Sequence, residues 1–245
     1  MSEAKLLAVV VMAGGKGVRM KSELPKALAM FKGRPMLSSV LDTARALTPD
    51  KIVVIVGHKR EVVIEAVKAT DVVFAAQEPQ LGTAHAVAQA REALAGFKGS
   101  VAVLSADVPA ITVDTLRKLI NLRETENAAI SVLTCVLDNP ASYGRIIREG
   151  SRVVANVEAK DATPEQLKIN EINSGVYVFD AGFLFESITK VGNENAQKEY
   201  YLTDLIAMAV NAGLKVSALI AENPAETLGV NTLEDLQKLE SAAGR

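Results

Sequence analysis

The chain has 245 residues, of which 49% are hydrophobic and 23% are charged, and its net charge at pH 7 is −2. These values are ordinary for a globular protein and exclude the basic excess that is typical of nucleic-acid-binding proteins. An anionic ligand must therefore be held by a local group of side chains and not by the overall field of the protein.

Neither cysteine usage nor hydropathy points outside the cytoplasm. The single cysteine, Cys135, lies in the apolar run 130–137, where we expect a buried small side chain. One cysteine forms no internal disulfide, which fits a reducing compartment. The apolar run 6–13 leads into glycines and is too short to cross a bilayer, so it is interpreted as a buried strand. We expect a cytoplasmic protein without a nucleic-acid or membrane partner.

The first half of the sequence alternates between segments typical of strands and of helices. Apolar runs without alternation indicate strands that are covered on both faces. The alternation predicts an α/β fold with a Rossmann-like, doubly wound, mostly parallel sheet. Strands are expected at 6–12, 52–56, 72–75 and 101–104, and helices at 37–47, 60–68, 82–94 and 112–125.

The second half is less regular and predicts antiparallel insertions in this sheet. The triplet Glu149-Gly150-Ser151 indicates a hairpin turn, and Gly213 is placed to close a helix. We expect residues 1–245 to form one domain, with a first half at about 1–127 and a second at about 128–231. Strands are expected at 128–137, 143–147, 153–157, 176–179 and 215–220, and helices at 183–188, 202–212 and 233–242.

A glycine-rich loop, Ala13-Gly14-Gly15-Lys16-Gly17-Val18-Arg19-Met20, follows the first predicted strand directly. Glycines let backbone N–H groups approach a phosphate, and loops after parallel strands are where ligands bind. The loop matches neither the Walker pattern nor the dinucleotide fingerprint, since Met20 stands where the latter has a glycine or alanine. A plain tight turn is the alternative interpretation.

Two cations, Arg19 and Lys26, flank this loop. Pro25 restricts the backbone before Lys26 and so limits where the lysine points. Arginine can bind two phosphate oxygens at once, and lysine is a compact charge suited to a single phosphate. The alternative is a pair of solvated surface cations.

Beyond this loop, further motifs make a family resemblance specific. The chain resembles the uridyltransferase half of the bifunctional N-acetylglucosamine-1-phosphate uridyltransferase/glucosamine-1-phosphate acetyltransferase family, from about Leu7 to Asn231. Each motif alone is weak, but the combination is specific. The motifs are Gly14–Met20 with Pro25-Lys26, Gln77–Ala86, Tyr143–Ile146, Glu158–Thr163, Asn170–Gly175, Glu199–Asp204 and Gly229–Asn231.

The resemblance implies a transfer of uridylyl from UTP to N-acetylglucosamine 1-phosphate, with Arg19 and Lys26 on the phosphates. Gln77 would bind the uracil edge, because an amide offers both a donor and an acceptor. The first half of the chain would bind the nucleotide and the second half the sugar. The nucleotide residues implied are Ala13, Gly14, Gly15, Gly17, Gln77, Gln80, Gly82 and Thr83, and the sugar residues are Gly144, Glu158 and Asn173.

The resemblance also implies a Mg²⁺ cofactor held by Asp107 and Asn231. A carboxylate and an amide oxygen suit a hard ion that keeps water and phosphate oxygens as its other ligands. Asp107 ends a predicted buried strand, where open α/β sheets bind ligands. For Asn231 the residues alone favour an ordinary helix N-cap, because Thr232 and Leu233 begin a predicted helix.

Three departures separate the chain from the family pattern. Val18 stands where threonine is usual, and Ser105-Ala106 replace a glycine and the residue before it ahead of Asp107. The chain ends at Arg245, so the β-helical acetyltransferase half is not expected, nor is acetyl transfer. The two histidines carry weaker signals: His58 is expected at the surface, and His85 in a packing or orienting role near the nucleotide.

Two alternative functions stay open on the sequence. One is a related nucleotidyltransferase that uses another sugar or dTTP, because selectivity depends on the shape of the site. The other is a non-catalytic sugar-nucleotide sensor, which the presence of Arg19, Lys26, Asp107 and Asn231 disfavours. Monomer and dimer are both compatible with the sequence.

Overall fold

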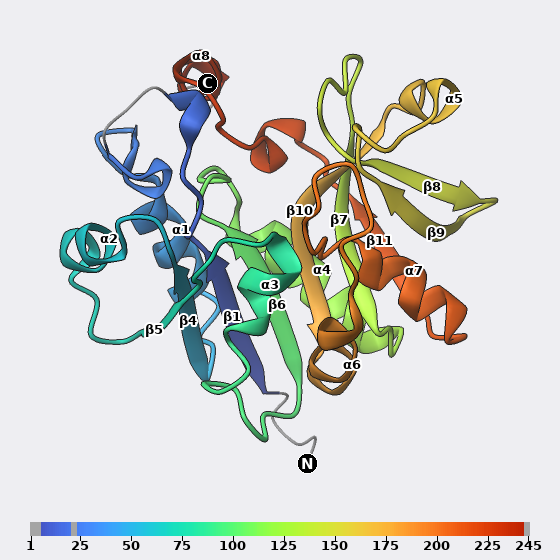
Figure 1. The fold of residues 1–245 in the computed structure, drawn as a ribbon, viewed down its shortest axis with the longest axis horizontal. Coiled ribbons are helices and arrows are strands. Elements are labelled where there is room, and N and C mark those ends of the chain that lie inside the picture. Colours follow the sequence, from blue (N-terminus) through green and yellow to red (C-terminus); the bar gives the residue numbers. More distant parts are fainter. Residues whose placement is uncertain (1–5, 21–23, 243–245) are drawn as a thin grey trace.

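The computed structural model describes residues 6–20 and 24–242, and its centre is one mixed sheet. The strand order is β11-β7-β10-β6-β1-β4-β5, and β8 extends the sheet from β10 and pairs with β9 (Figure 1). The strands are β1 (Leu7–Met12), β4 (Lys51–Val56), β5 (Val73–Ala76), β6 (Ser100–Ser105), β7 (Ile130–Val136), β8 (Arg145–Glu149), β9 (Arg152–Val157), β10 (Glu171–Asp180) and β11 (Val216–Ile220).

The N-terminal half supplies the parallel part of the sheet. Strand β1 pairs in parallel with β4 and β6, so that Val10 lies between Val53 and Val103, and β5 adds to β4 in the same direction. All three of these valines are fully buried, as the unbroken apolar runs predict. The carboxyl ends of β1, β5 and β6 therefore meet at one edge of the sheet.

Helices cover both faces, which confirms the doubly wound prediction. Val9 and Val11 of β1 pack with the helices of one face, and Ala8 and Val10 pack with those of the other. This alternation follows from the two-residue period of a strand. The first face carries α1 (Met36–Arg45), α2 (Arg60–Val67) and α4 (Val113–Thr125), and the second carries α3 (Thr83–Ala88), α6 (Ala181–Ser187) and α7 (Asp204–Asn211).

The expected antiparallel insertions are present. Strand β10 runs antiparallel to β6, β7 and β8, and β8 and β9 form the predicted hairpin, with Gly150 at a φ of 61° in the turn. Strand β10 begins at Glu171, five residues before the expected start. A register shift between Asn173 and Tyr177 and a φ of 79° at Gly175 interrupt its apolar pattern, which hides the strand from sequence analysis.

Other boundaries differ from the expectations. Helix α3 ends at Ala88 rather than at residue 94, because the following Ala-rich segment continues as successive turns up to Gly96, whose φ is 73°. The short hairpin of β2 (Met30–Phe31) and β3 (Arg34–Pro35) and the one-turn α5 (Pro164–Leu167) were not expected. No helix among the described residues combines the length and apolarity needed to span a membrane.

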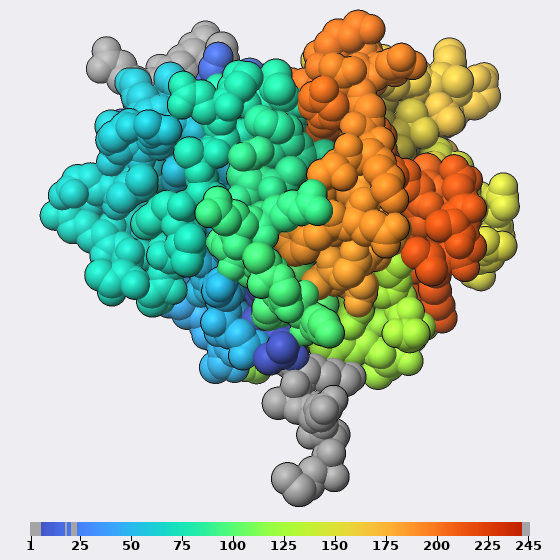
Figure 2. Space-filling model, turned by 60° about the horizontal axis from the view of Figure 1, so that its bottom comes forward, coloured from blue at the N-terminus to red at the C-terminus, as the bar shows by residue number. Residues whose placement is uncertain are grey.

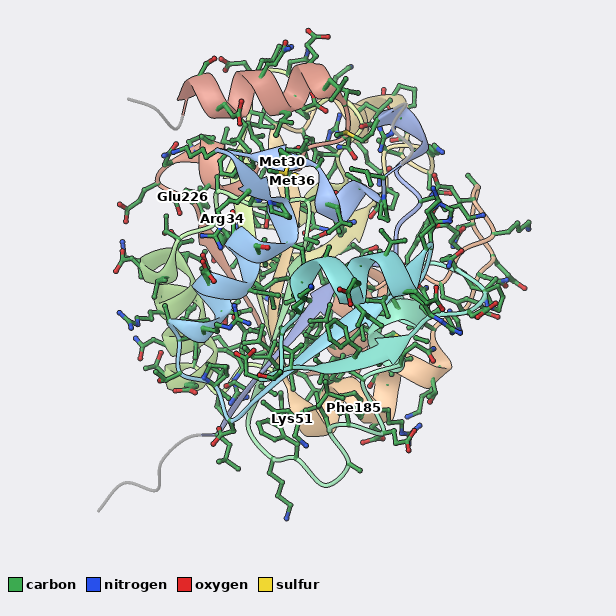
Figure 3. All side chains as sticks on the ribbon, turned by 90° about the vertical axis from the view of Figure 1, so that its left-hand side faces the viewer. Met30, Arg34, Met36, Lys51, Phe185 and Glu226 are labelled. Carbon is green, nitrogen blue, oxygen red and sulfur yellow. The ribbon has the colours of Figure 1, made fainter. Side chains whose placement is uncertain are left out.

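The last helix, α8 (Leu233–Ala242), returns to the N-terminal half. Its Leu239 packs with Phe31, Met36 and Val230 in a small separate core, and Met36 is labelled below α8 in Figure 3. This packing brings the segment 229–232 to the same edge of the sheet as the glycine-rich loop. Chain segments far apart in sequence thus meet at this edge.

Candidate active site

A cavity of about 690 Å³ opens at the carboxyl edge of the parallel strands. The glycine-rich loop after β1, residue 77 after β5 and residue 107 after β6 all reach it, as expected of an open α/β sheet. Sequence reasoning did not assign Lys16, Lys160 or Glu199, which also line the cavity. The predicted nucleotide, phosphate and metal residues all line it: Ala13, Gly14, Gly15, Gly17, Arg19, Lys26, Gln77, Gln80, Gly82, Thr83, Asp107 and Asn231.

Two glycines of the loop lie in close contact with neighbouring side chains. A Cβ on Gly14 would lie 3.1 Å from Oε1 of Gln77, and one on Gly17 would lie only 2.5 Å from Cβ of Lys26. Gly17 also has a φ of 62°, which favours glycine. The loop therefore lies directly against the side chains that sequence analysis assigned to the base and the phosphates. The side chain of Val18 lies outside the described part of the structure.

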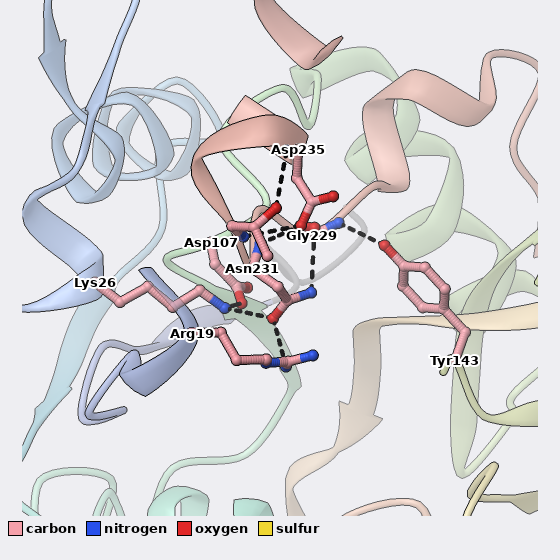
Figure 4. Close-up of polar contacts among 8 residues, drawn as sticks. Arg19, Lys26, Asp107, Tyr143, Gly229, Asn231 and Asp235 are labelled. Carbon is pink, nitrogen blue, oxygen red and sulfur yellow. Dashed lines mark hydrogen bonds and ion pairs between the residues drawn. The ribbon is translucent and has the colours of Figure 1, made fainter. Parts of the chain in front are cut away.

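Lys26 is the centre of a polar cluster at this edge (Figure 4). Its ammonium forms an ion pair with Asp107 Oδ2 and donates to Asn231 Oδ1 at 2.8 Å. Arg19 donates to the same amide oxygen at 2.9 Å. The Lys26 and Asp107 side chains are only 15% and 24% exposed, so the pair is largely removed from solvent. The structure thus brings all four predicted phosphate and metal residues into direct contact.

The arrangement of these oxygens fits a cation. Asp107 Oδ2 and Asn231 Oδ1 converge on one positive centre, which here is the Lys26 ammonium. No group of three or more histidine, cysteine, aspartate or glutamate side chains suited to a metal occurs among the described residues. Two oxygen ligands beside the glycine-rich loop are compatible with Mg²⁺, since the ion keeps waters and phosphate oxygens as its other ligands.

Asn231 is not the N-cap of α8, which corrects the interpretation favoured by the residues alone. Thr232 caps the helix: its Oγ1 accepts from Asp235 N at 3.1 Å, and Asp235 Oδ2 accepts from Thr232 N at 2.9 Å. The same Asp235 oxygen accepts from the backbone N of Asn231 at 2.9 Å (Figure 4). This reciprocal capping box fixes the backbone of Asn231 and leaves its side chain to the cavity.

The segment 229–231 is also fixed from two other directions. Val230 N donates to the Asp107 backbone oxygen at 2.8 Å, which joins the two predicted metal residues through the main chain. Gly229 N donates to the Tyr143 hydroxyl at 3.0 Å (Figure 4). Burial raises the pKa of this hydroxyl, so it stays protonated. Tyr143 belongs to the Tyr143–Ile146 motif and links the second half of the chain to the cluster.

On the opposite side of the cavity, α3 meets the segment 199–202. Ala84 N donates to the Tyr200 oxygen at 2.9 Å, and Leu202 N donates to Thr83 Oγ1 at 2.9 Å. Figure 2 shows the orange part of the chain lying against its green part. Gln77, buried to 5% exposure, contacts Gly82 and His85 from the neighbouring strand end. His85 therefore lies beside Gln77, one of the residues that the sequence predicts to bind the nucleotide.

The three predicted sugar residues lie together, and Glu158 lines a second cavity of about 490 Å³. Asn173 N donates to Gly144 O at 3.0 Å, and Asn156 Nδ2 donates to Glu158 Oε1 at 3.1 Å. A Cβ on Gly144 would lie 2.7 Å from both polar atoms of the Asn156 side chain. Asn156 therefore packs between two of the predicted sugar residues, although sequence analysis did not identify it.

Two titratable side chains of this second region, Glu158 and Tyr177, have raised pKa values. Burial, with the nearby charges of Asp161 and Asp204, raises the pKa of Glu158 despite hydrogen bonds from Thr203 and Asn156. Burial also raises the pKa of Tyr177, whose hydroxyl is bonded to Asn173 Nδ2. Perturbed carboxyl groups of this kind concentrate at functional sites.

Elsewhere, Cys135 is fully buried as predicted.

Similarity to known proteins agrees with this geometry. The family model for a MobA-like NTP transferase domain matches residues 9–160. The bifunctional protein GlmU of Geobacter metallireducens is 47% identical over 227 residues, which cover 92% of this chain and 48% of the relative. The bifunctional protein GlmU of Thermus thermophilus is 48% identical over 235 residues, which cover 95% and 51%. The chain thus spans about half the length of the curated relatives it matches.

The fold has structural neighbours at low sequence identity. A protein described as a glucose-1-phosphate thymidylyltransferase from Bacillus anthracis superposes with a TM-score of 0.73 at 17% identity, over 97% of this chain and 95% of the neighbour. A nucleotidyl transferase from Methanothermobacter thermautotroptrophicus superposes with a TM-score of 0.65 at 16% identity, over 98% of both chains. These two likenesses confirm the predicted fold class. The identity to GlmU proteins, over about half of their length, confirms the resemblance to their uridyltransferase half that the sequence motifs indicated. The family model that matches residues 9–160 shows that the chain belongs to the MobA-like NTP transferase family.

Proposed function

We propose that the protein transfers uridylyl from UTP to N-acetylglucosamine 1-phosphate and releases pyrophosphate. One observation carries this proposal: two cations, Arg19 and Lys26, meet two oxygen donors, Asp107 and Asn231, beside a glycine loop at a strand end. A reaction between two phosphate groups needs positive charge that offsets their mutual repulsion, and this arrangement supplies it. The identity of about 47% to GlmU proteins supports the choice of nucleotide and sugar.

In the proposed reaction, a phosphate oxygen of the sugar 1-phosphate attacks the α-phosphorus of UTP. An oxygen–phosphorus bond forms there, the bond to the bridging oxygen breaks, and pyrophosphate leaves with that oxygen. The attacking oxygen is already ionised, so the site needs no general base. The barrier is mainly electrostatic, because two anions must approach each other.

The described residues suit that task. Arg19 can bind two phosphate oxygens, and the compact charge of Lys26 can offset the charge at the transferred phosphate. Asp107 and Asn231 would hold Mg²⁺, which supplies further neutralisation of the phosphates when bound. In the free protein the same Asp107 oxygen pairs with Lys26, so the lysine and a metal would compete for it. The backbone N–H groups of the loop 13–17 would complete the phosphate cradle.

For the sugar we propose N-acetylglucosamine 1-phosphate, bound by Gly144, Glu158 and Asn173. Glu158 can accept hydrogen bonds from sugar hydroxyls through its second oxygen, since Oε1 already accepts from Asn156 and Thr203. Asn173 donates to Tyr177 and accepts from Gly175 N, which leaves one N–H and one lone pair for a ligand. On this proposal the nucleotide binds to residues up to about 127 and the sugar to residues 128–231.

A pyrophosphate-release assay with Mg²⁺ and UTP tests the proposal. We expect turnover with N-acetylglucosamine 1-phosphate and none in Asp107→Ala, whose fold should survive because the side chain lies at a cavity edge. Near wild-type turnover in that variant at saturating Mg²⁺ would exclude the assigned metal site. Binding of UTP without any turnover in the wild type would instead favour the non-catalytic sensor. Turnover with dTTP alone would assign another nucleotide.

A further inference from the structure

The orientation of the Gln77 side chain is fixed by the protein. Its amide nitrogen donates to the backbone oxygen of Gly82 at 2.9 Å and lies 3.3 Å from Nδ1 of His85. A carbonyl oxygen only accepts, so the nitrogen end of the amide must face α3. The amide oxygen is then directed to the glycine loop, where a Cβ on Gly14 would approach it to 3.1 Å.

His85 completes this orientation. For Nδ1 to accept the second amide hydrogen, the ring must be neutral with its proton on Nε2. His85 lies in α3, its backbone oxygen accepts from Nε2 of Gln89 just after the helix at 2.9 Å, and its ring lies beside that of Tyr200 with centroids 6.5 Å apart. In that tautomer both N–H groups of Gln77 are used by the protein, so only an acceptor is presented to the cavity and not the donor and acceptor expected from the sequence.

We propose that His85 is the positioning residue that makes the site selective for a pyrimidine with an imide N–H. The proposal rests on the proposed function, because it concerns how the same site distinguishes nucleotides. Uracil carries a hydrogen on N3 that the Gln77 oxygen can accept, and thymine carries the same group. Cytosine presents a bare ring nitrogen there, so two acceptors would face each other.

The direction of the effect follows from what each contact does. Without His85 the amide nitrogen keeps only its bond to Gly82, so a flipped amide that turns its N–H groups to the cavity costs one hydrogen bond fewer than in the wild type. Binding of UTP is then weakened and binding of CTP is no longer opposed. The base lies away from the reacting phosphorus, so the change should appear in KM and not in kcat.

The test compares three replacements of His85. His85→Leu removes the acceptor, and His85→Gln moves it one bond farther from the backbone. His85→Asn places an oxygen two bonds from Cβ, where Nδ1 stands in histidine, and should therefore restore the contact. Arg91→Leu, at an exposed position shortly after α3, is the control for general perturbation of this segment. Each variant is assayed for kcat and KM with UTP and with CTP, and for equilibrium binding of both nucleotides by calorimetry.

Loss of one hydrogen bond predicts that the UTP/CTP ratio of kcat/KM falls about 3- to 10-fold in His85→Leu and His85→Gln. The ratio should stay at the wild-type value in His85→Asn and Arg91→Leu. If His85→Leu does not fold, the UTP/CTP ratio of His85→Gln tests the role of His85 in its place. An unchanged UTP/CTP ratio of kcat/KM in folded His85→Leu and His85→Gln would refute the role of His85. A ratio in His85→Asn that falls as far as in these two variants would also refute it.

The two proposals fail separately. A wild-type protein that binds UTP more tightly than CTP but transfers no uridylyl would refute the proposed function, and the binding ratios would still test His85. A wild-type enzyme that is active with UTP and whose selectivity is unaffected by His85 replacement would refute only this inference.

Discussion

Replacing Lys26 with alanine should change metal binding and catalysis in opposite directions. In the free protein the Lys26 ammonium pairs with Asp107 Oδ2 and donates to Asn231 Oδ1, so it competes with a metal for both oxygens. Breaking a partly buried, charge-assisted contact of this kind is worth about 1–2 kcal/mol, which is a roughly 5- to 30-fold change in an equilibrium constant. Lys26→Ala should therefore bind a divalent cation that much more tightly when no nucleotide is present.

The same variant should be a poor enzyme. Without the ammonium, charge at the transferred phosphate is no longer offset, and kcat should fall by about 10²–10³-fold. The KM for UTP should change far less, because Arg19 and the loop 13–17 still bind the phosphates. A change in KM alone would show that Lys26 only binds substrate.

The metal measurement uses Mn²⁺ as a paramagnetic probe of free and bound ion, in the absence of UTP. Lys118→Ala is the control for the loss of one positive charge, since Lys118 pairs with Asp114 and Glu222 on the exposed face of α4. We expect its Mn²⁺ affinity to equal that of the wild type. Unchanged or weaker Mn²⁺ binding in Lys26→Ala would refute the competition between the lysine and the metal.

Three further changes test other parts of the site. Gly144→Ala should raise the KM for the sugar phosphate and leave the KM for UTP unchanged, because the new Cβ would lie 2.7 Å from the Asn156 side chain. Thr232→Ala should cost about 1 kcal/mol in urea unfolding and lower kcat by displacing Asn231, whereas Thr232→Ser should retain both properties. Because burial raises the pKa of Glu158, its carboxylate costs stability as pH rises through that folded-state value. Glu158→Gln should therefore unfold at higher temperature than the wild type at neutral pH, with the advantage vanishing in acid, while it binds the sugar phosphate more weakly.

The sequence predicts the parallel half of the fold well, for a physical reason. Strands covered on both faces are continuous apolar runs, and 6–12 and 52–56 correspond within one residue to β1 and β4. The start of β10 is missed, because Asn173, Ser174 and Gly175 break the apolar pattern where the register of the strand shifts. Sites at which polar residues replace apolar ones are where local patterns fail.

Part of the candidate site could likewise be predicted from the sequence, and part could not. The glycine loop, Lys26 and Asp107 could be placed together because strand ends of a parallel sheet meet at one edge. Asn231 could not be placed from local signals, since the residue before a predicted helix start is an ordinary capping position. Only the tertiary structure shows that Thr232 forms the cap and that Asn231 reaches Lys26 across more than two hundred residues.

The contact between Gln77 and His85 lay beyond sequence analysis for a different reason. The two residues are eight positions apart, one after a strand and one in a helix, and their hydrogen bond depends on the turn between them. Sequence analysis missed Asn156 because this residue contributes by packing against Gly144. No spacing in the sequence indicates that contact.

The most direct test of the central claim is the ratio of kcat/KM for N-acetylglucosamine 1-phosphate and glucose 1-phosphate, with UTP and Mg²⁺ in both assays. A site that pairs with the acetamido group leaves buried polar groups unsatisfied when that group is missing, at a cost of about 1–3 kcal/mol each. We expect a preference of about tenfold or more for the N-acetylated sugar, with UDP-N-acetylglucosamine identified by mass spectrometry as the product. Equal values, or a preference for glucose 1-phosphate, would contradict the assigned substrate.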